Sequence, residues 1–193
     1  MSAARFDAVV FDLDGTLVDS ARAMQRIAAR LMAELGAEPL TLDEVKRFVG
    51  NGAPMFLDRA LAARGIEADD ATRAAHLARF RALYAAAPGD DNPPFAGAEA
   101  ALDALAAAGL PLGLCTNKPG TPTRNQLAAL GWSGRFASVV AGDTLAAPKP
   151  HPDVPARVLA ELGATRALYV GDSETDEETA RAAALPFALY RHG

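Results

Sequence analysis

Two aspartates, Asp12 and Asp14, stand two positions apart directly after a short apolar run at residues 8–11. Gly15 follows them and favours a tight turn that keeps both carboxylates exposed. Two carboxylates on one backbone bend can provide a nucleophile, a general acid and ligands for a hard cation. The alternative is an ordinary Asp-Gly turn whose carboxylates only cap a loop. At ordinary residue frequencies, Asp-x-Asp-Gly-Thr arises roughly once in a hundred thousand positions, which favours chemistry.

Polar residues also follow three further apolar segments. They are Thr116 and Asn117 after residues 110–115, Lys149 in the loop after 138–140, and Asp172 and Asp176 after 167–170. In an open α/β sheet, ligands bind beyond the carboxyl ends of the strands, so these side chains are expected to share one rim.

Each of these residues could instead have a purely structural role. Thr116 could cap the next helix, although Thr121 suits that position better, and Asp172 or the serine after it could cap the last helix. Lys149, between two prolines, could be a solvated loop residue. Two glutamates follow Asp176, so a solvated helix face is the favoured interpretation of that residue alone. It is improbable that all four residues have only these structural roles, so the pattern favours a shared functional site.

The residue types suit phosphoryl transfer. A carboxylate that attacks phosphorus forms an aspartyl-phosphate, which water then hydrolyses. Mg²⁺ takes one or two carboxylates together with substrate phosphate and water. A hydroxyl and a lysine stabilise the transferring group, and a second carboxylate protonates the leaving alkoxide.

The segments that position these residues predict an α/β fold with a doubly wound parallel sheet. The expected strands lie at residues 7–11, 110–115, 138–140, 167–170 and 187–190. Beyond residue 97 they alternate with expected helices at 97–108, 121–130, 153–162 and 174–184. Residues 19–84 have only helical periodicity, with a capping box at Thr41 and Glu44. A Pro-rich linker follows at 88–94. We therefore expect a core domain over 1–18 and 88–193 and a helical domain over 19–87.

Composition excludes several classes of protein. Half of the 193 residues are apolar, which supports a packed core, and the net charge of −5 without a basic stripe argues against nucleic acid as a partner. No apolar run approaches the ~18–20 residues of a membrane span, and the first strand leaves no room for a signal peptide. Cys115 is the only cysteine and suits a reducing compartment, so we expect a cytoplasmic protein. Lysine is rare, and two of the three, Lys118 and Lys149, lie beside the candidate site.

With these residues in hand, the chain resembles the haloacid dehalogenase superfamily, most closely its phosphoglycolate phosphatase-like branch. Four ordered motifs carry the resemblance, at residues 12–20, 115–118, 149–152 and 170–176. The resemblance implies a Rossmann-like core with an inserted small four-helix cap. It also implies an enzyme that hydrolyses phosphoric monoesters with Mg²⁺ as cofactor.

The resemblance further implies catalytic roles. Asp12 is the nucleophile and Asp14 the general acid and base. Thr116 holds the phosphoryl group with support from Asn117, and Lys149 neutralises charge between Asp12 and the phosphoryl oxygens.

The metal ligands implied by the resemblance are Asp12, the backbone carbonyl of Asp14, and Asp172. Asp176 acts through water or holds Lys149, and Lys118 is a further supporting residue.

A cap loop over residues 48–52 resembles the family's substrate-facing loop. Its Gly50, Asn51 and Gly52 are the expected substrate-binding positions. Three nearby cations are candidates for a substrate carboxylate, although solvated helix charges are favoured for at least two of them: Lys46, Arg47 and Arg59.

The leading hypothesis is a Mg²⁺-dependent phosphatase that acts on a small phosphate monoester through an aspartyl-phosphate, with 2-phosphoglycolate as the first guess. A phosphosugar mutase on the same scaffold is an alternative, and so is a catalytically weak relative that binds a phospho-metabolite. A dehalogenase is disfavoured because that chemistry does not need Asp14 as an acid. Monomer and homodimer both remain open.

Overall fold

Five parallel strands form one sheet in the order β3-β2-β1-β4-β5. They are β1 Ala8–Phe11, β2 Leu112–Cys115, β3 Ser138–Val140, β4 Ala167–Gly171 and β5 Phe187–Leu189. This computed structural model describes residues 6–89 and 92–191. Part of the predicted linker, residues 90–91, and both ends of the predicted core domain, 1–5 and 192–193, therefore lie outside the description. The predicted parallel sheet is confirmed.

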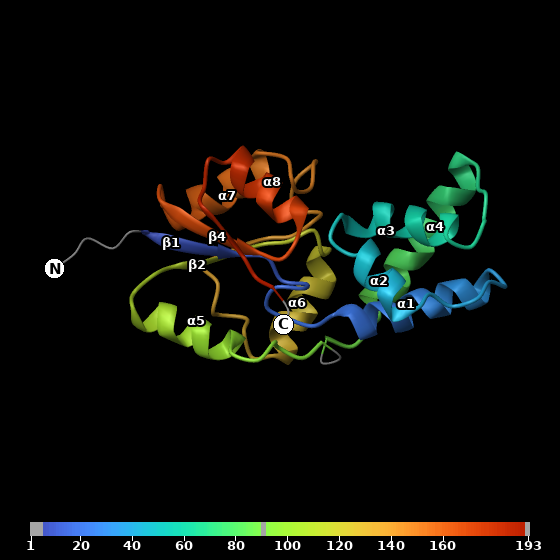
Figure 1. Cartoon of the computed structure of the whole chain (residues 1–193), viewed down its shortest axis with the longest axis horizontal. Helices are drawn as coiled ribbons and strands as arrows, with labels where there is room; N and C mark the ends of the chain where they lie inside the picture. Colours follow the sequence, from blue (N-terminus) through green and yellow to red (C-terminus); the bar gives the residue numbers. More distant parts are fainter. Residues whose placement is uncertain (1–5, 90–91, 192–193) are drawn as a thin grey trace.

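Helices cover both faces of the sheet (Figure 1). One face carries α5 Ala98–Ala107 and α6 Gly120–Ala129, and the other carries α7 Asp153–Leu162 and α8 Glu174–Ala182. Successive residues of β1 alternate between them: Phe11 packs in a cluster with Leu102 of α5, whereas Val10 packs in a cluster with Val158 of α7. Because both faces are buried, β1 is a continuous apolar run rather than an alternating one.

A block of four helices is inserted between β1 and α5 and lies beyond one end of the sheet (Figure 1). Its members are α1 Ala21–Glu34, α2 Leu42–Phe48, α3 Gly52–Ala62 and α4 Asp70–Ala85. The capping box predicted at Thr41 and Glu44 begins α2 and is confirmed. No helix within 6–89 or 92–191 is long and apolar enough to cross a membrane.

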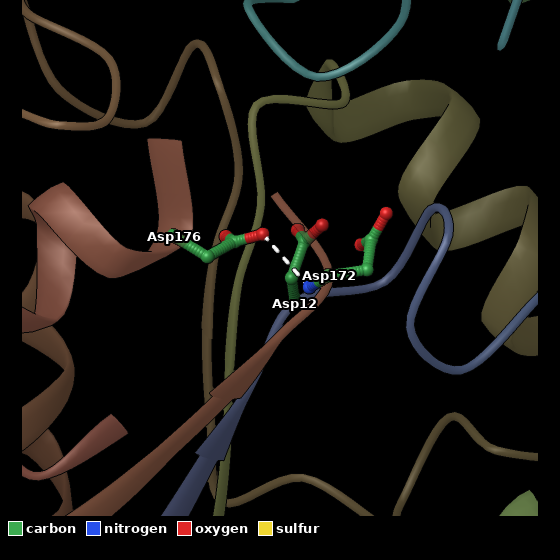
Figure 2. A group of neighbouring side chains, drawn as sticks. All are labelled: Asp12, Asp172 and Asp176. Carbon is green, nitrogen blue, oxygen red and sulfur yellow. Dashed lines mark hydrogen bonds between the residues drawn. The ribbon is translucent and has the colours of Figure 1, made fainter. Parts of the chain in front are cut away.

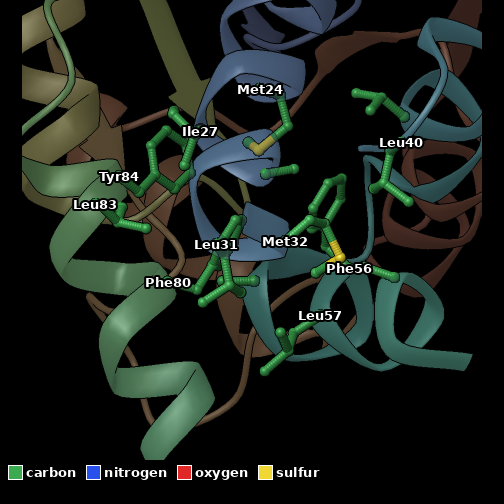
Figure 3. Close-up of a cluster of buried hydrophobic side chains, with 14 of the residues drawn as sticks. Met24, Ile27, Leu31, Met32, Leu40, Phe56, Leu57, Phe80, Leu83 and Tyr84 are labelled. Carbon is green, nitrogen blue, oxygen red and sulfur yellow. The ribbon is translucent and has the colours of Figure 1, made fainter. Parts of the chain in front are cut away.

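The four helices enclose their own hydrophobic cluster, whose members all lie between Met24 and Ala87 (Figure 3). At its centre the rings of Phe56 and Phe80 stack with their centroids 5.2 Å apart. The helical block therefore has a core separate from the two clusters that flank the sheet.

The chain enters and leaves this block at one place. The backbone N–H of Asp19 donates to the carbonyl of Pro93 at 2.9 Å, and the N–H of Phe95 donates to the carbonyl of Leu17 at 3.0 Å. The outgoing and returning segments thus pair with each other beside the end of β1.

Candidate active site

Strand register places the polar chain segments side by side at the carboxyl end of the sheet. Phe11 lies opposite Leu114 of β2 and Val170 of β4, so the residues that follow these strands emerge at one level. The N–H of Asp12 donates to the carbonyl of Val170 at 2.9 Å. Asp12 and Asp172 follow neighbouring strands, and Asp176 reaches them from α8 (Figure 2).

Lys149 connects the candidate nucleophile to the fourth motif. Its ammonium donates to Asp12 Oδ1 at 2.8 Å, to Asp176 Oδ1 at 2.7 Å and to the hydroxyl of Tyr169 at 3.3 Å. The lysine is buried, and both carboxylates beside it are buried too. The interpretation of Lys149 as a solvated loop residue is therefore wrong.

Asp176 is fully buried, so the prediction that it lies on a solvated helix face is also wrong. It occupies the third position of α8, and its Oδ2 accepts from the N–H of Ser173 at 3.1 Å and of Asp172 at 3.2 Å. Ser173 in turn caps the helix, which completes a capping box and turns the Asp176 side chain back toward the sheet. Burial raises the pKa of Asp176, but Lys149 and Ser173 outweigh that effect and hold it below its ordinary value.

Asp12 lies where negative charge accumulates. Burial raises the pKa of Asp12 to about 8; Asp176 and Asp172 add to the rise, while Lys149 opposes it. The Lys149 ammonium is shared by two carboxylates, Asp12 and Asp176, so ionised Asp12 lacks a full counter-charge from this lysine. A divalent cation would supply it.

The donor set fits Mg²⁺, which prefers carboxylate oxygens. Oxygen atoms of Asp12, Asp172 and Asp176 lie within 4.8 Å of one another. Both oxygens of Asp176 already accept hydrogen bonds, so Asp12 and Asp172 are the better placed ligands. The hydroxyl of Thr16 donates to Asp172 Oδ1 at 2.8 Å and orients that carboxylate.

Gly15 leaves space for Asp172. Its φ is +92°, and a Cβ at this position would lie 2.3 Å from Asp172 Oδ2. We expect Gly15→Ala to displace the Asp172 carboxylate and to weaken divalent-cation binding about 10- to 100-fold, as loss of an orienting contact does in other metal sites. Titration calorimetry with Mg²⁺ measures the change.

The matched control for this prediction is Gly36→Ala. Gly36 also has a positive φ, +67°, but nothing lies within 4 Å of the added methyl. It therefore imposes similar backbone strain without a clash. Equal loss of cation affinity in both variants would contradict the prediction.

Asp14 and Thr116 lie beside Asp12 around a small cavity of about 40 Å³. Lys118 also lines it and donates to Asp14 Oδ1 at 2.8 Å. Burial lowers the pKa of Lys118, but the attraction of Asp14 outweighs burial, so the pKa is raised.

Asn117 links three segments of the chain. Its Oδ1 accepts from the N–H of Lys149 at 2.9 Å, and its Nδ2 donates to the carbonyls of Lys149 at 3.2 Å and Gly50 at 3.1 Å. The backbone of the Lys149 loop and the loop of the helical block are thus held by one amide side chain.

The predicted loop at residues 50–52 divides into two parts. Gly50 and Gly52 line the cavity with Asp12, but Asn51 does not. The Asn51 amide instead donates to the hydroxyl of Thr175 at 2.7 Å. Asn51 therefore ties the helical block to the start of α8.

The three cations proposed near this loop lie outside the small cavity. Lys46 and Arg47 are exposed, and Lys46 lines a wider outer cavity that also reaches Asp12. Arg59 donates to the backbone carbonyls of Arg47 and Phe48 and supports the loop itself.

The capping role suggested for Thr121 is wrong. Helix α6 begins at Gly120, and the Gly120 N–H donates to the Asp143 carboxylate.

Thr16 and Tyr169 are functional contacts that the sequence interpretation missed. Thr16 belongs to the first motif, so its place beside Gly15 was the available signal. Tyr169 gave no signal, because a tyrosine inside an apolar strand is typical of a core residue. Only the fold places its hydroxyl against Lys149.

Comparison with known proteins places these features in context. A family model described as haloacid dehalogenase-like hydrolase matches residues 9–190. Phosphoglycolate phosphatase of Cereibacter sphaeroides (strain ATCC 17029 / ATH 2.4.9) is 47% identical over 186 residues, which cover 96% of this chain and 85% of the relative. Phosphoglycolate phosphatase of Rhodospirillum rubrum is 46% identical over 192 residues, 96% of this chain and 80% of the relative.

Solved structures share the fold. A predicted phosphoglycolate phosphatase from Haemophilus somnus 129pt superimposes with a TM-score of 0.86 at 25% identity, covering 97% of this chain and 86% of the other. CbbY from Rhodobacter sphaeroides in complex with phosphate superimposes with a TM-score of 0.77 at 24% identity, covering 97% and 87%. The second likeness concerns the fold alone.

Proposed function

Because this chain belongs to the haloacid dehalogenase-like hydrolase family, we propose that it is a Mg²⁺-dependent phosphatase of small phosphate monoesters, with 2-phosphoglycolate as its first candidate substrate. The observation that carries the proposal is the cavity lined by Asp12, Asp14 and Thr116 at the ends of adjacent strands. The relatives named phosphoglycolate phosphatase, 47% and 46% identical, support the choice of substrate.

In the proposed reaction, a carboxylate oxygen of Asp12 attacks phosphorus, and the bond from phosphorus to the ester oxygen breaks. Asp14 gives its proton to the departing alkoxide. Water then attacks the phosphorus of the aspartyl-phosphate and gives a proton to Asp14. The bond from phosphorus to the Asp12 oxygen breaks, so inorganic phosphate leaves and the Asp12 carboxylate is restored. Asp14 is therefore an acid in the first step and a base in the second.

Charge stabilisation comes from groups around Asp12. Thr116 and Lys149 would hold the phosphoryl oxygens, with Asn117 supporting the Lys149 loop. Asp12, Asp172 and the backbone carbonyl of Asp14 would hold Mg²⁺, which neutralises charge on the phosphoryl oxygens when bound. Asp176 keeps Lys149 in place through their 2.7 Å ion pair.

We propose that the helical block, residues 19–87, is a cap domain and that residues 1–18 and 88–193 form the catalytic core domain. The separate hydrophobic cluster within the helices supports this division. Gly50 and Gly52 line the cavity from the cap side, and Asn51 bonds to the core. The cap would exclude bulk water and select the substrate.

A free, buried Cys115 is compatible with the predicted cytoplasmic location.

The test is phosphate release from a panel of small phosphate esters, first with Mg²⁺ and then with excess chelator. We expect 2-phosphoglycolate to be hydrolysed best and chelation to reduce turnover by at least about 1,000-fold, because the metal carries much of the charge stabilisation. Restoring Mg²⁺ should restore the rate.

Two results would redirect the assignment. Turnover that persists in chelator would contradict the metal requirement. No release from any ester by the folded protein would argue against a phosphatase, and phosphate transfer that needs a bisphosphate activator would indicate the phosphosugar mutase instead.

A further inference from the structure

Lys118 is a buried cation that the proposed reaction does not yet use. Its side chain is 1% exposed, and its ammonium pairs with Asp14 at 2.8 Å. The ammonium also lies 5.3 Å from the centroid of the Tyr84 ring, which belongs to α4 of the helical block. Lys118 therefore stands between the candidate acid and the cap.

The cavity that Lys118 lines is mostly apolar on its cap side. Met24, Phe56, Phe80 and Tyr84 of the cap contribute to its wall. Among the described residues that line this cavity, Lys118 is the only cation. The other polar side chains of its wall, Asp12, Asp14, Thr116 and Asn117, belong to the proposed phosphoryl and acid positions. An anionic group of the substrate beside the phosphoryl position would therefore have the Lys118 ammonium as its cationic partner.

We infer that Lys118 recognises a carboxylate of the substrate, and that this carboxylate takes the place of Asp14 on the Lys118 ammonium. The inference rests on the proposed phosphatase function and adds a specificity-determining residue to it. Asp14 has to reach the ester oxygen, and in a phosphoglycolate-like substrate one CH₂ separates that oxygen from the carboxylate. A lysine in contact with Asp14 is therefore within reach of both groups.

The exchange links recognition to catalysis. In the structure, the Asp14 carboxylate is held by Lys118. A substrate carboxylate that binds Lys118 displaces the Asp14 carboxylate, which takes up a proton from solvent and turns toward the leaving oxygen. An ester without the carboxylate leaves the Lys118–Asp14 pair intact and reacts slowly, so selectivity appears in kcat as well as in KM.

The other cations near the site are less suited to this role. Lys149 is already held between Asp12 and Asp176. Arg59 is bound to backbone carbonyls of the cap loop. Lys46 is exposed and lines only the wider outer cavity, where solvent weakens its attraction for an anion.

The experiment compares kcat/KM for 2-phosphoglycolate with that for 2-hydroxyethyl phosphate, in which a neutral CH₂OH group replaces the carboxylate. We expect the wild type to prefer 2-phosphoglycolate by at least about 100-fold. Lys118→Met should lower this ratio by about 100-fold, mainly through 2-phosphoglycolate. The matched control, Lys46→Met, should change the ratio less than about threefold.

Two outcomes of this experiment would overturn the inference. An equal fall for both esters in Lys118→Met would mean that the lysine acts only through Asp14. A changed ratio in Lys46→Met alone would place carboxylate recognition at the cap rim.

A second variant and a binding measurement cover the cases in which the first variant does not fold or neither ester is hydrolysed. If Lys118→Met does not fold, Lys118→Gln, which can still donate to Asp14, should show the same loss of ratio. If the wild type hydrolyses neither ester, the proposed function fails, and calorimetric Kd values for the two esters then measure the ratio directly. An unchanged Kd ratio in the Lys118 variant would overturn the inference on its own.

Discussion

Replacing Asp12 with asparagine is expected to reduce phosphate release by a factor on the order of 10⁵ while the protein stays folded. Asparagine keeps the shape of the side chain but is not a nucleophile of comparable strength, so the aspartyl-phosphate cannot form. The hydrogen bond from Lys149 can still be accepted by the amide oxygen. Steady-state kinetics with the best ester of the panel measures the loss.

The same variant has an expected effect on stability. The pKa of Asp12 rises from 3.8 to about 8 on folding, so the folded state binds the proton more tightly and ionisation of Asp12 weakens folding. The penalty grows as pH increases from about 4 to about 8. Without metal at about pH 9, Asp12→Asn should therefore unfold at a higher urea concentration than the wild type.

Asp103→Asn is the matched control, because Asp103 lies exposed on α5 and pairs with Arg135 far from the candidate nucleophile. It should leave both turnover and the pH dependence of stability unchanged. If Asp12→Asn retained more than about one per cent of wild-type turnover, Asp12 would not be the nucleophile.

Replacing Lys149 with methionine is expected to lower the free energy of unfolding by about 3–5 kcal/mol. The substitution leaves the buried Asp176 carboxylate without the ammonium that lies 2.7 Å from it. Asp12, whose pKa of about 8 keeps it largely protonated at neutral pH, loses the hydrogen-bond donor that lies 2.8 Å from it. Burying charge without a partner is costly, whereas the methionine itself fits the volume. Urea unfolding at neutral pH without metal measures the change.

A double-mutant cycle with Asp176→Asn separates the pair from other effects. The double variant should recover part of the loss, because the Asp176 charge that Lys149→Met leaves unpaired is removed as well. Lys46→Met, which removes an exposed lysine of the same length, should cost no more than about 0.5 kcal/mol. A loss below about 1 kcal/mol in Lys149→Met would contradict the importance of the buried network.

Much of the fold follows from sequence because its signals are local. The apolar runs after which Asp12 and Asp172 stand are short and flanked by turns, which is typical of buried parallel strands. Parallel strands then oblige their carboxyl ends to meet, so the collection of site residues at one rim could be predicted without coordinates. The family match and the parallel sheet confirm the resemblance that the four motifs indicated.

The errors arose where tertiary contacts outweigh local pattern. Asp176 lies among acidic residues, so its local pattern indicated a solvated helix face, although the resemblance implied that it acts through water or holds Lys149. The fold shows how the second role is possible, because the capping box turns the side chain toward Lys149. Thr121 has a good capping side chain, but Asp143 from a distant loop supplies the bond at the start of α6. The Lys118–Asp14 pair joins residues 104 positions apart, a distance over which periodicity carries no information.

The pairing of the outgoing and returning segments beside β1 has a consequence for how such proteins can diversify. Since the core itself holds the two ends together through backbone hydrogen bonds, the cost of closing an inserted segment rises only slowly with its length. A helical insert of another size, or of another architecture, can be exchanged at this junction without changing the register of the strands. Substrate choice and bond-breaking chemistry are thereby free to evolve as separate modules of one chain.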